Sequence, residues 1–495
     1  MSGPRPSGAG RKSGRQHASA GHRGRRSGAR GSQGDYQGSA PGDPARRTAY
    51  DVLRSVAESD AYANLVLPPL LTERGITGRD AAFCTELTYG TLRMQGRYDA
   101  IVDLVSSRPA ARLDAGLRDV LRLGLHQLLS MRVPTHAAVS ETVALARTVA
   151  GTGPSGLANA VLRRLAQEPS EHWLAELARQ HTGTEALAAV HSHPAWVVRA
   201  MRQALAEQAD SELVPALEAN NTPAPVTLAV RPGLAQAQDL TGVHTDPGRW
   251  APGAAVLTSG DPGALAGVTA GRIGVQDEGS QVVTRALAGV PIDGPDSTWL
   301  DLCAGPGGKA ALFGALLAER DSSGTLVANE VAPHRAKLVT GSTRSLAGHL
   351  PGLEVRTGDG RQIGESEPGR YDRVLVDAPC TGLGALRRRP ESRWRRRPGD
   401  LAELGALQRD LLTSALHTAR PGGVVAYITC SPHVAETTLV VQDVLRDFGH
   451  ATLLDAAEAV QEVVAHPMPA LAGPMVQLWP HRHGTDAMFL ALIQR

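Results

Sequence analysis

From about Gly274 to the C-terminus, short apolar segments alternate with segments of helical periodicity. Strands that alternate with helices pair in parallel, because each intervening helix carries the chain back across the sheet. The pattern therefore predicts an α/β fold over residues 274–495, built on a doubly wound parallel sheet. The predicted strands are 298–302, 325–328, 353–356, 373–376 and 424–428.

The rest of the chain divides into three further parts. A chain of 495 residues exceeds what one hydrophobic core usually organises, so several domains are expected. Residues 1–43 are rich in Gly, Ser, Arg and Pro and predict a disordered basic tail, either in loose contact with nucleic acid or only solvated. Residues 44–168 show helical periodicity and predict an all-α domain. Residues 169–273 combine a helical part with short strands and predict a small α+β connector.

Composition narrows the class of protein. No apolar run is long enough to span a bilayer, and no apolar segment follows the basic N-terminus, so we expect a cytoplasmic protein. Nothing in the sequence demands more than a monomer, so a monomer is expected. Cys84, Cys303, Cys380 and Cys430 are too few for a disulfide framework and lack the paired spacings of a zinc site, so no metal is expected. Any special cysteine should be a reactive thiol, with Cys84 and Cys303 structural. Lysine occurs at only three positions, which draws attention to Lys309 in a glycine-rich loop.

That glycine-rich loop, residues 301–309, follows an apolar strand and opens a helix. This is where an α/β sheet binds nucleotide-like ligands, and glycines let the backbone approach them closely. A phosphate-binding P-loop is excluded, because it needs Gly at the position of Cys303 and Ser or Thr at that of Ala310. The dinucleotide spacing G-x-G-x-x-G is also absent.

Acidic residues follow the next two predicted strands. Glu330 is placed to accept hydrogen bonds from two ribose hydroxyls, and Asp359 from an adenine amino group. Three successive strand ends thus offer groups for the methionine, ribose and base of S-adenosylmethionine. The alternative, acids that only cap helices, is common for a single residue and less credible for three in order.

Cys380 and Cys430 each come just beyond the carboxyl end of an apolar strand. If these strands are neighbours, both thiols face the ligand crevice, although a cysteine is more often a small core residue. Carbon 5 of cytosine is a poor nucleophile, and a thiolate that adds to carbon 6 makes carbon 5 enamine-like. A second thiol then suits removal of the carbon 5 proton. The pair therefore indicates methylation of cytosine at carbon 5.

The motifs DLCAGPGGK, DAPC and TCSP together resemble the RNA cytosine-5 methyltransferases of the Nop2/Sun type, which have a Rossmann-like methyltransferase sheet. The helical part resembles the NusB-like RNA-binding domain. The whole ordered chain resembles the bacterial Sun/Fmu-type enzymes, which implies methylation of a cytosine of the 967 type in 16S ribosomal RNA. One departure is that Glu436 is followed by Thr437, where the family usually has Asn after the acid.

This resemblance implies roles for individual residues. Cys430 would be the nucleophile and Cys380 would promote product release, with Asp377 in contact with the cytosine and Lys309 also in the catalytic set. The implied ligands of S-adenosylmethionine are Cys303, Ala304, Gly305, Pro306, Gly307, Gly308, Lys309, Glu330, Arg335, Asp359 and Asp377.

An arginine-rich segment follows Cys380. Its proximity to the proposed site predicts contacts to RNA phosphates, although such a run is often only a solvated face. Trp394 within it either stacks on a base or packs. Two other functions stay open, the same reaction on transfer RNA and a non-catalytic RNA-binding or assembly factor. The predicted RNA-binding residues are Arg387, Arg388, Arg389 and Arg393, and the segment continues with Arg395, Arg396 and Arg397.

Overall fold

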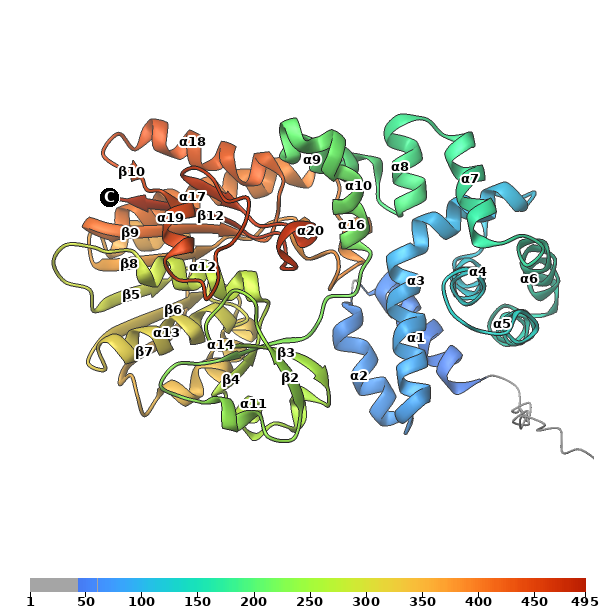
Figure 1. Ribbon diagram of the computed structural model, residues 1–495, viewed down its shortest axis with the longest axis horizontal. Helices are drawn as coiled ribbons and strands as arrows, with labels where there is room; N and C mark the ends of the chain where they lie inside the picture. The colour runs from blue at the N-terminus through green and yellow to red at the C-terminus, as the bar shows by residue number, and fades with distance from the viewer. Residues whose placement is uncertain (1–42, 60) are drawn as a thin grey trace, which may run out of the picture. The chain divides into compact units, whose positions relative to one another are not determined.

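The computed structural model describes residues 43–59 and 61–495, so the predicted basic tail lies outside the described residues except for Asp43. The described chain begins with helices packed around their own apolar core (Figure 1). Within the described ranges, no helix is long and apolar enough to cross a membrane. The helices are α1 (Pro44–Glu58), α2 (Ala63–Glu73), α3 (Gly78–Val105), α4 (Ala115–Leu129), α5 (Thr135–Ala150) and α6 (Thr152–Leu165).

Local sequence explains where these helices begin. The Asp43 carboxylate accepts hydrogen bonds from the backbone N–H groups of Ala45 (2.8 Å) and Arg46 (3.3 Å), and Pro44 occupies the first turn, where its missing N–H costs nothing. Asp114 caps α4 in the same way. The long helix α3 packs against α1 and α4. It also contacts α8 (Gly183–His191), so it links the helical part to the connector.

The connector combines helices with a small antiparallel sheet. Residues of α8, α9 and α10 form an apolar cluster that also includes Leu383, Leu386 and Trp479 from the C-terminal part of the chain, whereas α7 packs on the core of the helical part. The strand order of the sheet is β2-β3-β1-β4. Its elements are α7 (Ser170–Gln180), α9 (Ala195–Leu205), α10 (Ala209–Asn220), β1 (Thr227–Val230), β2 (His244–Pro247), β3 (Ala254–Ser259), α11 (Ala266–Thr269) and β4 (Ile273–Val275).

An eight-stranded sheet follows, and all five predicted strands are present in it. Its order is β10-β12-β9-β8-β5-β6-β7, with β11 paired to β12, and the five strands from β7 to β9 are mutually parallel. The predicted doubly wound parallel sheet is therefore confirmed, while the antiparallel strands at one side were not predicted. The strands are β5 (Thr298–Asp301), β6 (Thr325–Glu330), β7 (Gly352–Thr357), β8 (Tyr371–Asp377), β9 (Ala419–Thr429), β10 (Thr452–Leu453), β11 (Met475–Gln477) and β12 (Phe489–Gln494).

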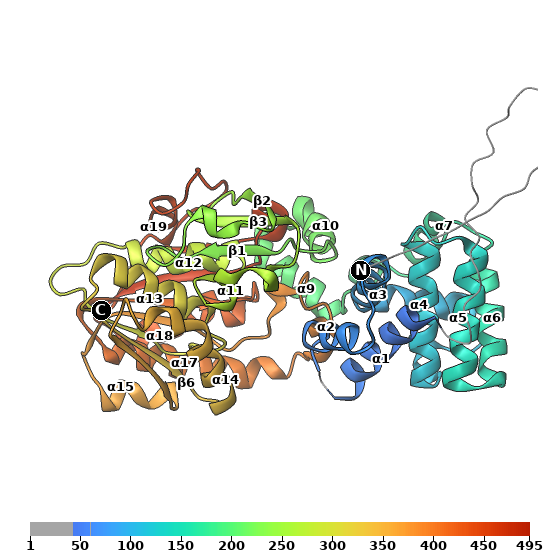
Figure 2. The ribbon, with the colours of Figure 1, turned by 90° about the horizontal axis from the view of Figure 1, so that it is seen from below.

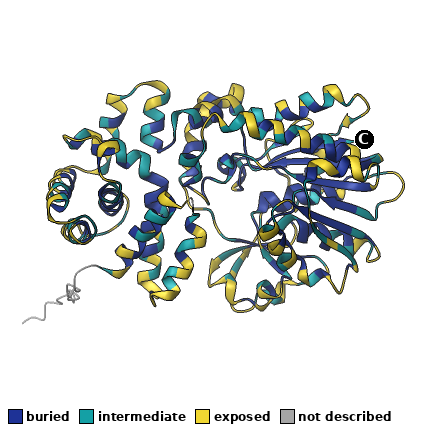
Figure 3. Ribbon diagram, turned by 180° about the vertical axis from the view of Figure 1, so that it is seen from behind, coloured by how far each residue is buried: buried dark blue, intermediate teal, exposed yellow. Residues whose placement is uncertain are grey.

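Helices cover both faces of this sheet, which is why its strands are apolar almost throughout (Figures 1 and 2). Figure 3 shows the central strands as buried and the outer sides of the helices as exposed. One face is covered by α12 (Glu278–Gly289), α13 (Gly308–Arg320) and α19 (Ala456–Gln461), and the other by α15 (Ile363–Ser366), α17 (Asp400–Thr418) and α18 (Thr438–Asp447).

The strand order fixes where a ligand crevice opens. From β5 the chain builds outward through β6 and β7 and then returns to place β8 on the opposite side of β5. At such a reversal the connections leave in opposite directions and open a crevice at the carboxyl ends of the two strands. Those ends are Asp301 on β5 and Asp377 on β8, which puts the glycine-rich loop and the Cys380 loop next to each other.

Candidate active site

The glycine-rich loop between β5 and α13 fits closely against the end of β6. A side chain at Gly305 would place its Cβ 2.2 Å from Glu330 Oε2, and Gly307 has a φ of 110° that other residues rarely adopt. The Gly305 N–H donates to Glu330 Oε2 (3.0 Å). These glycines therefore let the loop lie directly on the Glu330 carboxylate.

Arg335, at the start of α14 (Pro333–Thr343), fastens this arrangement. Its guanidinium donates to the Gly305 carbonyl (2.6 Å) and lies 3.5 Å from Glu330 Oε1. Glu330 is buried and also accepts from the Ala332 N–H (3.0 Å). Arg335 thus holds the loop and the carboxylate that the sequence assigned to the cofactor.

Asp359 is the N-cap residue of the short 3-10 helix Gly360–Gln362. Its carboxylate accepts from the backbone N–H of Arg361 (3.0 Å) and pairs with the Arg361 guanidinium (2.7 Å), which holds the pKa of Asp359 below its ordinary value. It still lines the same cleft as Glu330. Asp359 therefore caps a helix, which is the alternative that the sequence left open, and it also lines the cleft in which a cofactor would bind.

Asp301 is a residue that the sequence analysis passed over. Its side chain is fully buried, and neither carboxylate oxygen has a hydrogen-bond partner within residues 43–59 and 61–495. Burial, together with the neighbouring Asp377 carboxylate, raises the pKa of Asp301 to about 8. The Asn329 side-chain oxygen at the end of β6 is likewise buried without a partner in the described chain. Unsatisfied buried acceptors of this kind call for a ligand that donates hydrogen bonds.

These groups fit S-adenosylmethionine. Its ammonium and ribose hydroxyls are donors, and Asp301 at the end of β5 and Asn329 and Glu330 at the end of β6 are acceptors beside a loop backbone kept clear by glycines. The cleft that Asn329 and Glu330 line has a volume of about 1230 Å³, large enough for the cofactor and a base. Cys303, Gly305, Pro306, Glu330, Arg335, Asp359 and Asp377 of the predicted cofactor set line it. Among the described residues, no group of three or more His, Cys, Asp and Glu side chains is placed to hold a metal ion.

The two cysteines face this same cleft. Cys380 lies in the loop after β8 and Cys430 directly after β9, and these neighbouring parallel strands pair Asp377 with Ile428. The Cys430 carbonyl accepts from the Gly384 N–H (3.0 Å), which ties the two loops together. The structure thus brings both predicted thiols to the cofactor loop, whereas Cys84 is buried in the helical core.

Charged groups around the thiols differ. Burial raises the pKa of Cys380 to about 12, and the Glu436 carboxylate adds to the effect. Burial also raises the pKa of Cys430 well above its ordinary value, with Asp486 adding and the Lys309 ammonium opposing. Both groups are therefore thiols in the resting protein, and Cys430 is the one with a cation beside it.

That cation is held by Asp377. Lys309 Nζ donates to Asp377 Oδ2 at 2.8 Å, and both side chains are mostly buried. Burial disfavours the ammonium, but the Asp377 carboxylate outweighs burial and the pKa of Lys309 lies above its ordinary value. The ion pair of Lys309 and Asp377 connects the start of α13 to the end of β8, between the glycine-rich loop and the two cysteines.

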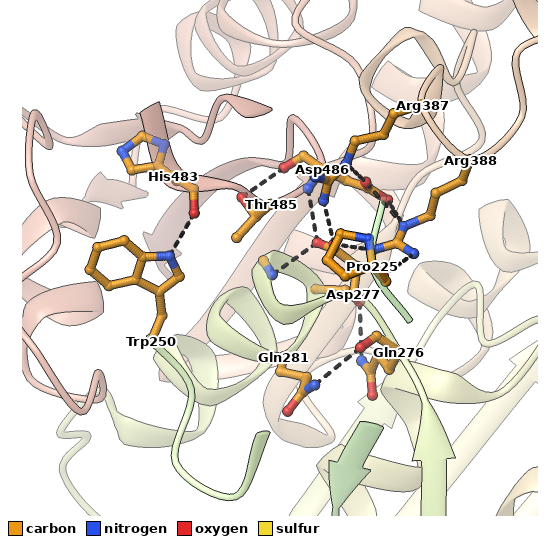
Figure 4. A network of polar contacts seen from close by, with 12 residues as sticks. Pro225, Trp250, Gln276, Asp277, Gln281, Arg387, Arg388, His483, Thr485 and Asp486 are labelled. Atoms are coloured by element: carbon orange, nitrogen blue, oxygen red, sulfur yellow. Dashed lines mark hydrogen bonds and ion pairs between the residues drawn. The ribbon is translucent and has the colours of Figure 1, made fainter. Parts of the chain in front are cut away.

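Three of the four predicted RNA-binding arginines are directed elsewhere. Arg387 and Arg388 both pair with Asp277 and Asp486 at 2.7–3.0 Å, in the network of Figure 4. Arg393 has no exposed surface and donates to the Ser192 and Asn220 carbonyls and the Asn221 side chain, and burial lowers its pKa to about 9. The prediction of phosphate contacts is therefore corrected for Arg387 and Arg393, because their guanidinium groups are buried in contacts within the protein, while the partly exposed Arg388 is held by the same two carboxylates as Arg387.

Arg389 is the one that reaches the cleft. Its side chain is exposed, lines the cleft and lies 4.9 Å from the ring centroid of Tyr62, at the start of α2. Arg395 lies over the same ring at 4.9 Å and donates to the carbonyls of Val56 and Ala61. Trp394 packs on α3 at Gly96, where a Cβ would lie 2.2 Å from its ring. The arginine-rich segment therefore joins the helical part to the cleft.

The buried ion pairs of Arg387 give a stability prediction. Replacing Arg387 with methionine leaves Asp277 and Asp486 facing each other with one guanidinium, so we expect a loss of about 3 kcal/mol in the free energy of unfolding. Urea unfolding followed by circular dichroism measures it, with Arg446→Met on exposed α18 as the matched control. Unchanged stability with weakened RNA binding would restore the original assignment of Arg387.

Comparisons with known proteins agree with this architecture. A family model described as 16S rRNA methyltransferase RsmB/F matches residues 292–494, and one described as NusB family matches residues 43–167. Rv1407 of Mycobacterium tuberculosis (strain H37Rv) is 50% identical over 92% of this chain and 97% of its own length. Ribosomal RNA small subunit methyltransferase B of Escherichia coli O6:K15:H31 is 31% identical over 84% of this chain and 93% of its own. The crystal structure of PH0851 shares the fold, with a TM-score of 0.73 at 21% identity over 91% of this chain and 98% of that chain.

Proposed function

Because this chain belongs to the RsmB/F family of 16S rRNA methyltransferases, and so uses S-adenosylmethionine to methylate ribosomal RNA, we propose that its product is 5-methylcytosine. The target would be a single cytosine of the 967 type in 16S rRNA. The observation that carries the proposal is that Cys380 and Cys430 line one cleft together with the cofactor loop.

The proposed reaction begins when the Cys430 thiol gives up its proton to water in the cleft and becomes a thiolate. Its sulfur bonds to carbon 6 of the cytosine, and the electron pair of the ring double bond becomes available at carbon 5. When bound, S-adenosylmethionine supplies the methyl group that carbon 5 takes and leaves as S-adenosylhomocysteine. A base then removes the carbon 5 proton, the double bond re-forms, and the bond between sulfur and carbon 6 breaks to return the Cys430 thiolate.

Local charges support the assignment of Cys430 as nucleophile. Burial raises the pKa of Cys430 and the Lys309 ammonium opposes that rise, whereas the Glu436 carboxylate adds to the rise that burial causes in the pKa of Cys380. A thiolate forms more readily beside a cation, so Cys430 is the better candidate for attack. Cys380, the other thiol that lines the cleft, is then the candidate base that removes the carbon 5 proton.

Asp377 is proposed to orient the base. Its carboxylate is partly exposed to the cleft and is fixed by Lys309 at 2.8 Å, so it can accept a hydrogen bond from the exocyclic amino group of cytosine. Uracil lacks that amino group, and its carbonyl oxygen would face the carboxylate. The arrangement therefore supports selection of cytosine over uracil.

The RNA is proposed to enter along the cleft between the helical part and the sheet. The cleft lining continues from the cysteines to Arg389 and Tyr62 and on to Arg118 of α4. Bases and phosphates of a single strand would find an aromatic ring and guanidinium groups along this path. The target cytosine must be unpaired or extruded to bring carbon 6 to Cys430.

Arg389 should contribute to RNA affinity through charge. Replacing it with alanine is expected to weaken binding to 16S rRNA several-fold and to reduce the slope of log K against log salt by about 1, because one phosphate contact is lost. Filter binding at four salt concentrations measures both quantities. Arg446→Ala, an exposed arginine on α18, is the control, and an equal effect of the two variants would contradict a specific role for Arg389.

Bisulfite sequencing of 16S rRNA and transfer RNA from cells with and without the gene tests the proposed function. We expect one cytosine of 16S rRNA to lose its methyl group in the deletion strain. Loss confined to transfer RNA would identify the other substrate. No lost 5-methylcytosine at all, with impaired ribosome assembly, would indicate a non-catalytic factor.

A further inference from the structure

Glu436 is a buried carboxylate between the two cysteine loops. It ends the short 3-10 helix Val434–Glu436, six residues after Cys430, and its side chain has no exposed surface. No Lys or Arg of the described chain lies within ion-pair distance of it, although an unpaired buried charge costs several kcal/mol. The hydrogen bonds that the Glu436 oxygens accept must therefore stabilise the carboxylate at this buried position.

The oxygens accept four hydrogen bonds. Oε1 accepts from the Thr381 backbone N–H (2.7 Å) and the Gln408 side-chain amide (3.3 Å), and Oε2 from the hydroxyls of Thr381 (2.5 Å) and Ser431 (2.6 Å). The Thr381 and Ser431 hydroxyls are themselves 3.2 Å apart. Thr381 directly follows Cys380, and Ser431 directly follows Cys430. The Glu436 carboxylate thus accepts hydrogen bonds from the residue that follows each of the two cysteines.

We propose that Glu436 is a positioning residue that sets the placement of Cys380 relative to Cys430, an inference that rests on the proposed function. The two loops leave different strands, and sheet pairing ends at Asp377 and Thr429, before either cysteine. Beyond that point the Glu436 carboxylate and the bond from Gly384 N–H to the Cys430 carbonyl connect the loops. A thiol that must reach a proton on a base already bonded to the other thiol needs such a connection.

The Cys380 loop depends on Glu436 more than the Cys430 loop does. Thr381 contributes two of the four donors, one from the backbone, whereas Ser431 contributes only its hydroxyl. Cys430 also follows β9 directly, and β9 is fixed by β8 and β12 on its two sides. Loss of the carboxylate should therefore impair the step assigned to Cys380, product release, more than the attack by Cys430.

The charge of Glu436 gives a second readout. The groups that act on the Cys380 thiol are Glu436 and Asp377, the backbone N–H groups of Gly382 and Cys430, and the Tyr427 hydroxyl and Cys430 thiol nearby. Glu436 is the charged group that raises the pKa of Cys380 most. With glutamine in its place that pKa falls, so the thiolate of Cys380 is populated at lower pH.

The test uses the full-length enzyme and 16S rRNA from cells that lack the gene. For Glu436→Gln we expect turnover to fall more than tenfold with unchanged KM, since Glu436 touches no RNA. A protein–RNA adduct that resists denaturing electrophoresis should accumulate. Turnover is expected to rise with pH as the Cys380 thiolate forms, and in Glu436→Gln this rise should occur at lower pH than in the wild-type enzyme. Glu436→Asp keeps the charge but not the reach, so it should lose turnover while keeping the wild-type pH profile.

A control and a milder variant separate positioning from stability. Glu367→Gln removes a carboxylate that binds the Tyr371 hydroxyl and Arg356 at the other end of β8, so it should lower stability without adduct or pH shift. Thr381→Val removes one donor and should accumulate adduct to a smaller extent. Wild-type turnover and pH profile in Glu436→Gln and Thr381→Val would overturn the role of Glu436 alone. A wild-type enzyme that forms neither adduct nor 5-methylcytosine would overturn the proposed function with it.

Discussion

Alanine in place of Cys430 is expected to abolish methyl transfer to 16S rRNA, with a loss on the order of 10⁴-fold or more. The thiol is the proposed attacking atom, and no other cysteine of the chain follows β9. The substitution removes one sulfur atom from a cleft residue, so the fold should persist. Transfer of a radiolabelled methyl group to RNA from the deletion strain measures the loss, and denaturing electrophoresis should show no adduct.

The matched control for this variant is Cys84→Ala, in the helical core and away from the cleft. It should cost stability and leave turnover per folded molecule unchanged. If Cys430→Ala retained methylation while Cys380→Ala lost both methylation and adduct, the two thiols would have exchanged roles. Turnover in both single variants would exclude covalent catalysis by either.

The sheet and the juxtaposition of the thiols could be predicted because they depend on short-range patterns. Each strand of the parallel sheet is an apolar run followed by a helix, and functional groups at the carboxyl ends of such strands meet at one edge. That rule predicts Glu330, Asp359, Cys380 and Cys430 around one cleft, which all four line. The antiparallel strand β12 escaped prediction because no helix follows it to mark the alternation.

The arginines show where sequence reasoning stops. Arg387 and Arg389 are two residues apart, yet one is buried against Asp277 and Asp486 and the other is exposed at the cleft. The partners of Arg387 lie about a hundred positions away along the chain, before and after it. Only the tertiary fold brings those carboxylates to it, so the local run of positive charge could not distinguish an interior ion pair from an RNA contact.

Two acids were missed for a similar reason. Asp301 is the first residue of the predicted glycine-rich loop, and its lack of any hydrogen-bond partner in the described chain is visible only when the surrounding atoms are placed. The sequence pattern around Glu436 departs from the family only in the next residue, Thr437, and it assigns no role to the Glu436 carboxylate. Its position a few residues beyond Cys430 was the available signal, since a carboxylate just past a catalytic loop is placed to hold that loop. Three of the four hydrogen bonds that Glu436 accepts come from Thr381, in the loop after β8, and from Gln408 of α17, and no spacing along the chain indicates these contacts.

The second large effect is expected for Cys380→Ala, which should still attack the RNA and then fail to release it. Without the thiol that takes the carbon 5 proton, the adduct on Cys430 should become the predominant species on a denaturing gel, while turnover falls on the order of 10³-fold. Cys430→Ala combined with Cys380→Ala should remove the adduct. A single Cys380 variant that turned over normally without an adduct would refute the division of roles.

The pH dependence separates loss of the base from a general loss of activity. Burial and the Glu436 carboxylate raise the pKa of Cys380 to about 12, so its thiolate is a small fraction at neutral pH and grows with pH below that value. If that thiolate accepts the proton, release by the wild-type enzyme should accelerate as pH rises from 7 to 9, by up to about tenfold per unit. In Cys380→Ala the group that titrates is gone, so decay of the isolated adduct should lose this dependence. Pulse-chase measurement of adduct decay at several pH values therefore tests whether proton removal by Cys380, rather than the shape of its loop alone, limits product release.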